Sequence, residues 1–382
     1  MMKSIYWHRK FLSKYIIIAF TLFMLASLYL EQKFITVDHP GYSLKVKAAK
    51  KTAEVFSFIK EQFTFSGYDC NVTVDPMCSG LIGERISEIT TDSGNLKAKR
   101  SSLNPNISAY FIDLMLKAHL NSGDTVAVQM TGSYPALDIA MLSAISVMKL
   151  KPLIIFSVGS SNYGANRLNF SWPKIYRLLI ENNFFDYKIL GISIGGARDT
   201  GYRISDKTRQ HMIKIIRDNK FKYINIPNNK NATEYSISER LSLYYKAAVD
   251  NKIKAYINVG GNMASIGLKT NIYKRDLLVK PKSLPTGLIT ELPGSLTPVS
   301  SVAVSMLKSG VKVINIRDIM SRVIGHYDLP SDLKLMPKVG SGKLYEQETY
   351  NIYLAVTILM IDIIALLLVV YISHKYFISY KR

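Results

Sequence analysis

The stretch that decides the fold is Gly123-Asp-Thr-Val-Ala-Val-Gln-Met-Thr-Gly-Ser-Tyr-Pro135, in which a short apolar run leads directly into a turn of small residues. The same order returns at residues 153–161, 189–196 and 255–262. Segments with helical spacing of apolar residues separate these units. This alternation is typical of an open, mostly parallel, Rossmann-like α/β sheet with helices on both faces.

The periodicity predicts regular elements on both sides of this stretch. Strands are expected at residues 126–130, 153–158, 188–194, 222–226, 254–259 and 311–316. Helices are expected at residues 37–67, 107–118, 135–148, 173–182, 205–217, 235–249 and 299–309. Residues 262–297 are expected to form a long insertion, because they contain prolines and no clear period.

The chain is expected to contain five segments. They are a transmembrane anchor or signal-anchor at 15–30, a juxtamembrane helix with an irregular segment at 31–106, an α/β domain at 107–325, a linker at 326–349 and a transmembrane helix at 352–372.

Two apolar runs predict a two-pass membrane protein. The second run is long enough to cross a hydrocarbon core of ~30 Å, and the shorter first run can do so with its flanks. A cleaved signal peptide is the alternative for the first run, but no small-residue cleavage site follows it. Basic residues flank the outer ends of both runs, so residues 31–350 are expected outside the cytoplasm, with the protein in the cell membrane.

Asp362 lies near the middle of the second run. A carboxylate at this depth is costly. It predicts a contact with another membrane subunit, and the alternative is a protonated or snorkelling side chain in an otherwise sufficient helix.

The chain has two cysteines, Cys70 and Cys78. No histidine or further cysteine nearby completes a set of metal ligands, so we predict no metal site. Their short spacing is compatible with a disulfide loop outside the cytosol. Two free thiols remain the alternative.

The net charge of +21 stays strongly positive when the charges at the two ends of the chain are set aside. A basic body predicts a polyanionic partner. The alternative is a lysine-rich, solvated surface with no specific partner. Nucleic acid is a poor fit, because no nucleic-acid-binding motif occurs and the body is expected outside the membrane.

Because parallel strands end at one edge of a sheet, the small-residue turns are expected to line one cleft there. Free N–H groups at a helix start and two nearby cations suit a carboxylate. Ordinary capping and tight turns are the alternative. The predicted ligand-binding residues are Thr131, Gly132, Ser133, Tyr134, Ser157, Gly159, Ser160, Asn166, Gly195, Gly196, Gly260, Gly261 and Asn262, with Lys99 and Arg100 as the cations.

The signals for catalysis are weak. The chain has no nucleophile elbow, no phosphate-binding loop and no dinucleotide fingerprint, so we predict no cofactor. Ser133 is the candidate nucleophile, and Asp199, in a glycine-rich loop, is the candidate acid. The alternative for Asp199 is a turn-forming aspartate. A triad of Ser133 with His326 and Asp328 has no support beyond composition.

Four blocks resemble the bacterial poly-γ-glutamate system proteins. They are residues 89–105, 123–140, 150–166 and 257–267, and the resemblance covers most of residues 80–325. This family is named for its gene neighbourhood with poly-γ-glutamate synthesis and export. The resemblance therefore implies a role beside that polymer, but no reaction and no catalytic residue. The second apolar run, at residues 352–372, lies outside the region of resemblance.

These observations predict a membrane-anchored, exported protein that supports poly-γ-glutamate synthesis, export or surface retention by binding the anionic polymer at the strand-end cleft. One alternative is a hydrolase or transferase acting on γ-glutamyl amide bonds. Another is a scaffold for synthase or export subunits in the membrane. A deep cleft with a base near Ser133 would favour the enzyme. A shallow basic groove would favour the polymer-binding protein, and a filled cleft would favour the scaffold.

Overall fold

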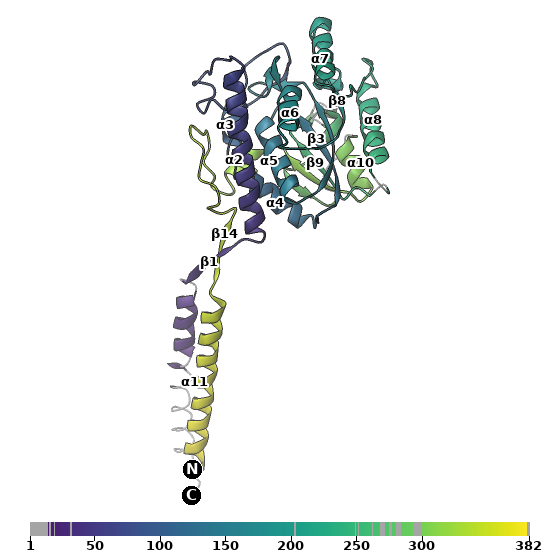
Figure 1. Cartoon of the computed structure of the whole chain (residues 1–382). Helices are drawn as coiled ribbons and strands as arrows, with labels where there is room; N and C mark the ends of the chain where they lie inside the picture. Colours follow the sequence, from purple (N-terminus) through teal and green to yellow (C-terminus); the bar gives the residue numbers. More distant parts are fainter. Residues whose placement is uncertain are drawn as a thin grey trace. The chain divides into compact units, whose positions relative to one another are not determined.

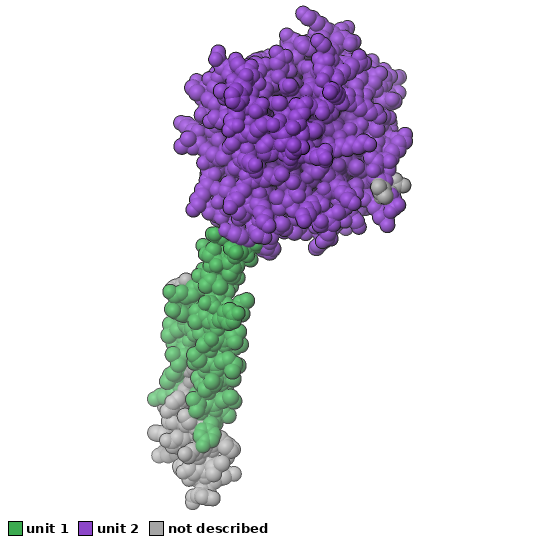
Figure 2. All heavy atoms as spheres, viewed as in Figure 1, with its two compact units in different colours: residues 1–39, 346–382 green, residues 40–345 purple. Residues whose placement is uncertain are grey.

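The computed structural model describes residues 14, 17–18, 20–30, 33–201, 204–248, 250, 252–261, 263–267, 272–274, 277–279, 284–292 and 300–379. The chain forms two compact units, which Figure 2 colours separately. The larger comprises residues 40–345, and the smaller comprises residues 1–39 and 346–382.

A six-stranded sheet forms the centre of the larger unit, with the strand order β12-β13-β9-β3-β4-β8. All its neighbouring pairs are parallel except β12 with β13. The predicted α/β class with a mostly parallel sheet is confirmed. The strands are β3 (Thr125–Thr131), β4 (Lys151–Ser157), β8 (Ile189–Ser193), β9 (Ala255–Val259), β12 (Gly287–Ile289) and β13 (Lys312–Ile316).

Helices cover both faces of this sheet, because successive strand residues point to opposite sides. In β3, Val128 packs into a cluster with α2 (Tyr42–Phe65), α4 (Ile107–Lys117) and α5 (Pro135–Val147). The adjacent Ala127 packs instead with α8 (Ala232–Ala247) and α10 (Val302–Lys308). The larger unit therefore has a helix–sheet–helix layering, which can be followed in Figure 1.

The remaining elements of the larger unit are short or peripheral. They are β2 (Thr90–Asp92), α3 (Leu96–Ser102), β5 (Ser160–Ser161), β6 (Asn166–Arg167), β7 (Phe170–Ser171), α6 (Trp172–Glu181), η1 (Ala197–Asp199), α7 (Asp206–Asp218), α9 (Met263–Ile266), β10 (Ile272–Lys274), β11 (Leu277–Val279) and η3 (Met320–Ile324).

Three features differ from the sequence expectation. Residues 222–226 form one bridge, Tyr223 to Ile192, rather than a strand. The insertion contributes β12, an antiparallel edge strand that could not be recognised because it is only three residues long. Residues 40–106 and 326–345 pack into the same unit as the sheet; Tyr345, for example, is fully buried and donates to Asn106 Oδ1 at 2.6 Å.

The smaller unit contains β1 (Phe34–Asp38), paired antiparallel with β14 (Glu346–Tyr350), and α11 (Ile352–Ser379). Among the described residues, Ile352–Tyr371 is the stretch long and apolar enough to cross a membrane. The described N-terminal apolar helix, Phe20–Leu30, is shorter. Asp362 lies in α11, and its Oδ2 has no hydrogen-bond partner among the described residues.

Candidate functional site

The four small-residue turns follow β3, β4, β8 and β9, which are parallel and consecutive across the sheet from β9 to β8. They therefore lie at one edge, as parallel strands require. We call the turns at residues 131–134, 157–161, 195–196 and 260–261 the carboxyl edge. Asn262 lies outside the described residues.

The turns of the carboxyl edge bond to one another and to neighbouring strands. The Gly132 N–H donates to Ser157 O at 3.2 Å, the Gly159 N–H to Ile194 O at 2.8 Å, and the Gly260 N–H to Ile316 O at 2.9 Å. The Ser160 hydroxyl donates to Gly132 O at 2.9 Å. These N–H groups are therefore already satisfied and do not form an open cradle for an anion.

Residues 80–94 cover the turn after β4. β2 pairs with β5, so that Thr90 lies opposite Ser160. The buried Asn166 fixes the start of this segment, because its amide accepts from Glu84 N and donates to Glu84 O, both at 2.8 Å. A Cβ on Gly159 would lie 2.8 Å from Thr91 Cγ2. The small residues thus make room for the protein's own chain.

The glycines after β8 and β9 are close-packed as well. A Cβ on Gly195 would lie 2.9 Å from Ser157 Cβ, and one on Gly196 would lie 3.2 Å from Thr91 Cβ. Both glycines have positive φ, which other residues rarely adopt. A Cβ on Gly260 would lie 2.8 Å from Thr131 Oγ1, and one on Gly261 would lie 2.5 Å from Ile266 Cδ1. Thr131 Oγ1 also accepts from Ser133 N at 3.2 Å.

Lys99 is the cation that α3 brings to the carboxyl edge. Its side chain is almost fully buried, and its Nζ donates to Ser161 Oγ at 2.9 Å and to the Ser133 carbonyl. The Nζ also lies 3.5 Å from the centre of the Tyr134 ring. Burial lowers the pKa of Lys99 to about 7, although Asp138 and Asp92 act in the opposite direction.

Asp138, in the first turn of α5, was not singled out from the sequence, because one aspartate in an apolar helix carries no motif. It is fully buried, beside the backbone of Thr131 and the amine of Lys99. Burial raises its pKa well above the ordinary value, while Lys99 opposes that shift. The carboxyl group of Asp138 and the amine of Lys99 are therefore both buried at the start of α5.

Ser133, the predicted nucleophile, uses its hydroxyl within the turn. Its Oγ accepts from Ser161 N at 3.0 Å, and only its backbone carbonyl contacts Lys99. Among the described residues, His326 and Asp328 are not brought to it: His326 packs edge-on against Tyr327, and Asp328 pairs with Lys343.

Arg100 does not share the site with Lys99. Its guanidinium donates to Val74 O at 3.0 Å, to Thr73 O and to Asp332 Oδ1 at 2.9 Å. Those contacts anchor the loop of the disulfide, in which Cys70 and Cys78 are bonded with their Cα atoms 5.5 Å apart. Arg100 therefore holds two segments of the chain together.

Asp199 belongs to a buried ion pair on the α8 side of the sheet. Its Oδ2 lies 2.6 Å from Arg240 Nη2, and both side chains are fully buried. Ser193 and Ser236 donate to the same carboxylate at 2.6 and 2.5 Å. These contacts give Asp199 a structural role that its glycine-rich sequence context did not indicate.

Arg317, directly after β13, is a second cation near Tyr134 that sequence reasoning missed. Its Nη1 is buried without a hydrogen-bond partner among the described residues. Burial raises the pKa of Tyr134 to about 12; Asp318 adds to this shift and Arg317 opposes it. In the sequence, the available signal for Arg317 was its position directly after the apolar run that forms β13.

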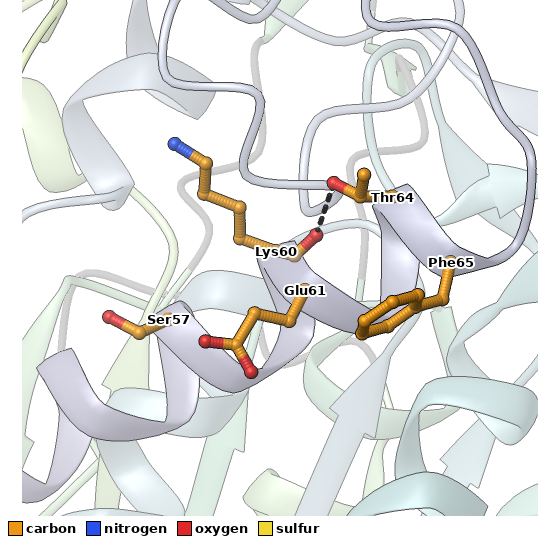
Figure 3. A pocket seen from close by; sticks show the side chains of 5 residues that line it. All are labelled: Ser57, Lys60, Glu61, Thr64 and Phe65. Atoms are coloured by element: carbon orange, nitrogen blue, oxygen red, sulfur yellow. Dashed lines mark hydrogen bonds between the residues drawn. The ribbon is translucent and has the colours of Figure 1, made fainter.

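A cavity of about 300 Å³ lies elsewhere, on the exposed side of α2. Figure 3 shows its lining residues on successive turns of this one helix. They are Ser57, Lys60, Glu61, Thr64 and Phe65. None belongs to the carboxyl edge, so this cavity and the predicted cleft are different places.

No model of a known protein family matches the chain, and no curated protein matches it. The chemistry of the described residues therefore carries the functional interpretation. The carboxyl edge offers a buried amine beside a hydroxyl, whereas the hydrogen-bonded turns around them are filled by the protein itself.

Proposed function

We propose that this protein is a two-pass membrane protein with its α/β unit outside the cytoplasm, and that it supports the synthesis, export or surface retention of poly-γ-glutamate or another anionic polymer. The pairing of β1 with β14 is the observation that carries the membrane part. The polymer part rests on the basic charge and on the four sequence blocks.

The β1–β14 pair favours a helical hairpin. The N-terminal apolar helix ends at Leu30, shortly before Phe34, and α11 begins at Ile352, directly after Tyr350 pairs with Phe34. Because the pair is antiparallel, the chain enters and leaves it at the same end. Two apolar helices attached at one end would cross a bilayer in opposite directions.

Exposed aromatic residues lie where the two apolar helices join the β1–β14 pair. Tyr29, Phe34, Tyr350 and Tyr353 are 51, 48, 51 and 86% exposed. Aromatic side chains concentrate where a membrane meets water, because their rings are apolar and tyrosine adds a polar hydroxyl. This placement supports β1 and β14 lying at the outer membrane surface.

Thiol labelling tests the topology. After mild reduction, a membrane-impermeant maleimide is expected to label Cys70 and Cys78 in intact spheroplasts, because both lie in the exported unit. In a Cys70→Ser/Cys78→Ser background, Ser379→Cys at the end of α11 is expected to react only after lysis. Labelling of the native cysteines only after lysis would contradict the proposed orientation.

The exposed face of α7 supports binding of a polyanion better than the filled turns do. Lys207, Lys214 and Arg217 are exposed on this helix, while Met212 and Ile216 face the core. At 1.5 Å per residue the three cations span ~15 Å along the helix. A polymer with one carboxylate per repeat can meet such a row without entering a pocket.

Polymer binding at low salt tests this surface in the purified full-length protein. The triple variant Lys207→Gln/Lys214→Gln/Arg217→Gln is expected to bind poly-γ-glutamate about tenfold more weakly, since each lost surface ion pair costs about 0.5 kcal/mol. The difference should shrink as salt screens these exposed charges.

A matched triple variant controls for net charge. Lys246→Gln, Lys252→Gln and Lys308→Gln remove the same charge from exposed positions outside α7. They are expected to retain most of the binding. Equal losses in both triples would show general attraction to a basic protein and would contradict a binding surface on α7.

A further inference from the structure

We propose that the amino edge of the central sheet, where its parallel strands begin, binds the headgroups of anionic lipids at a membrane surface. This edge is defined by six lysines at the first position of β4, β8, β9 and β13 or up to three positions before it. They are Lys149, Lys151, Lys188, Lys252, Lys254 and Lys312. The lipid contact goes beyond the proposed function, but it rests on the membrane part of that function.

Strand pairing brings the lysines of the amino edge into a row. Lys151, the first residue of β4, lies opposite Thr125 at the start of β3. On the other side of β3, the Lys254 N–H donates to Thr125 O at 2.9 Å, and Lys312 begins the next strand, β13. Because neighbouring strands are ~4.8 Å apart, the row extends over ~14 Å, and Lys188 before β8 extends it to ~19 Å.

The row carries positive charge that the protein does not neutralise. Five of the six lysines are exposed, and Lys312 is half-buried. Among the described residues, none of the six forms an ion pair. The acids close to these lysines in the chain are Asp124, Asp186 and Asp250, so the lysines outnumber them two to one. Negative lipid headgroups would therefore meet more attraction than repulsion at this edge.

The amino edge lies beside the point where the larger unit begins. A Cβ on Gly41, the second residue of this unit, would lie 2.6 Å from Leu116 Cδ1 near the end of α4. Directly after the same helix, Ala118 O accepts from Lys312 Nζ at 2.8 Å. The end of α4 therefore contacts both the start of the unit and the first lysine of the row.

The larger unit also ends close to its start. The ring centre of Tyr345, its last residue, is 6.1 Å from that of Tyr42, the first residue of α2. β1 and β14 have five residues each. A strand of that length spans at most ~17 Å, so the chain connection to the apolar helices is short. It keeps the lysines near the membrane that those helices are proposed to enter.

Lysine footprinting of the purified full-length protein tests the contact. The protein is placed in phosphatidylcholine vesicles, with or without phosphatidylglycerol, and treated with a membrane-impermeant acylating reagent. Phosphatidylglycerol is expected to slow acylation of Lys151, Lys188 and Lys254 about fivefold, because an anionic surface attracts each nearby lysine. Lys207 and Lys214 on α7 are internal controls and should react at an unchanged rate. High salt should remove the difference, because it screens exposed charges.

A variant with three fewer charges tests whether the lysines act together. In Lys151→Gln/Lys188→Gln/Lys254→Gln, phosphatidylglycerol should no longer slow the acylation of Lys149. The triple variant of α7 removes the same charge elsewhere and should keep this effect. All the substituted lysines are exposed, and unfolding curves should show that both variants fold.

Three results would overturn the lipid contact. They are equal acylation rates in the two kinds of vesicle, equal slowing of the α7 lysines, and slowing by added poly-γ-glutamate but not by phosphatidylglycerol. The last result would assign the amino edge to the polymer. Extraction with alkaline carbonate distinguishes these results from a failure of the proposed anchor. A protein that leaves the vesicles in carbonate would contradict the membrane part of the proposed function, and the lipid contact with it.

Discussion

Asp199→Asn is expected to lower the free energy of unfolding by about 3–5 kcal/mol, the usual cost of breaking a buried ion pair. Asp199 and Arg240 are fully buried, 2.6 Å apart. Asparagine keeps the shape of the side chain and tolerates the positive φ of 61° at this position. The substitution therefore removes mainly the negative charge and leaves the buried guanidinium without it. Denaturant unfolding of the purified protein measures the loss.

Asp206→Asn is the matched control for this experiment. Asp206 also lies 2.6 Å from an arginine, Arg209, but its side chain is 91% exposed. Exposed pairs contribute about 0–1 kcal/mol, so this variant should unfold almost like the unchanged protein. If Asp199→Asn left stability unchanged and removed an activity, the carboxylate would be a working acid and not a structural one.

Much of the fold could be predicted from the sequence, because the relevant signals are local. An apolar run followed by a small-residue turn gives both the strand and the point where it ends. Once those strands are parallel, their carboxyl ends must share an edge. The same local signals placed α5 and β9 within one or two residues of their observed bounds.

The partners of the candidate site could not be predicted in this way, because they are distant in sequence. Lys99 and Ser161 are 62 positions apart, and Asp199 and Arg240 are 41 apart. Whether a polar residue in a loop meets solvent, a ligand or a buried counter-charge depends on what packs over it. No pattern around Asp199 indicates that Arg240 lies beneath it.

The small residues at the strand ends illustrate the same limit. Glycine permits close approach of a backbone, but the sequence does not say whether a ligand or another loop approaches. In the structure, residues 80–94 occupy that place, and Thr91 packs against Gly159. A turn that binds a ligand and a turn that packs against another loop therefore have the same sequence signature.

Gly159→Ala is expected to destabilise the larger unit by about 1–3 kcal/mol, the usual cost of overfilling a packed site. The new methyl group would lie 2.8 Å from Thr91 Cγ2 and 2.9 Å from Ile194 O. Ile194 cannot move freely, because its carbonyl accepts the Gly159 N–H at 2.8 Å. The segment carrying Thr91 must therefore shift away from the carboxyl edge, and the midpoint of denaturant unfolding measures the cost.

A double-mutant cycle with Thr91→Ala separates packing from other effects of the alanine. Thr91→Ala removes both the methyl group and the hydroxyl, which would lie 2.8 and 3.2 Å from the new Cβ. The two substitutions together should therefore cost less than the sum of each alone, by about 0.5 kcal/mol or more. Strict additivity would mean that Thr91 does not meet the new methyl group. Unchanged stability of Gly159→Ala with weakened polymer binding would instead show that the space above Gly159 is kept for a ligand, and would restore the carboxyl edge as the polymer site.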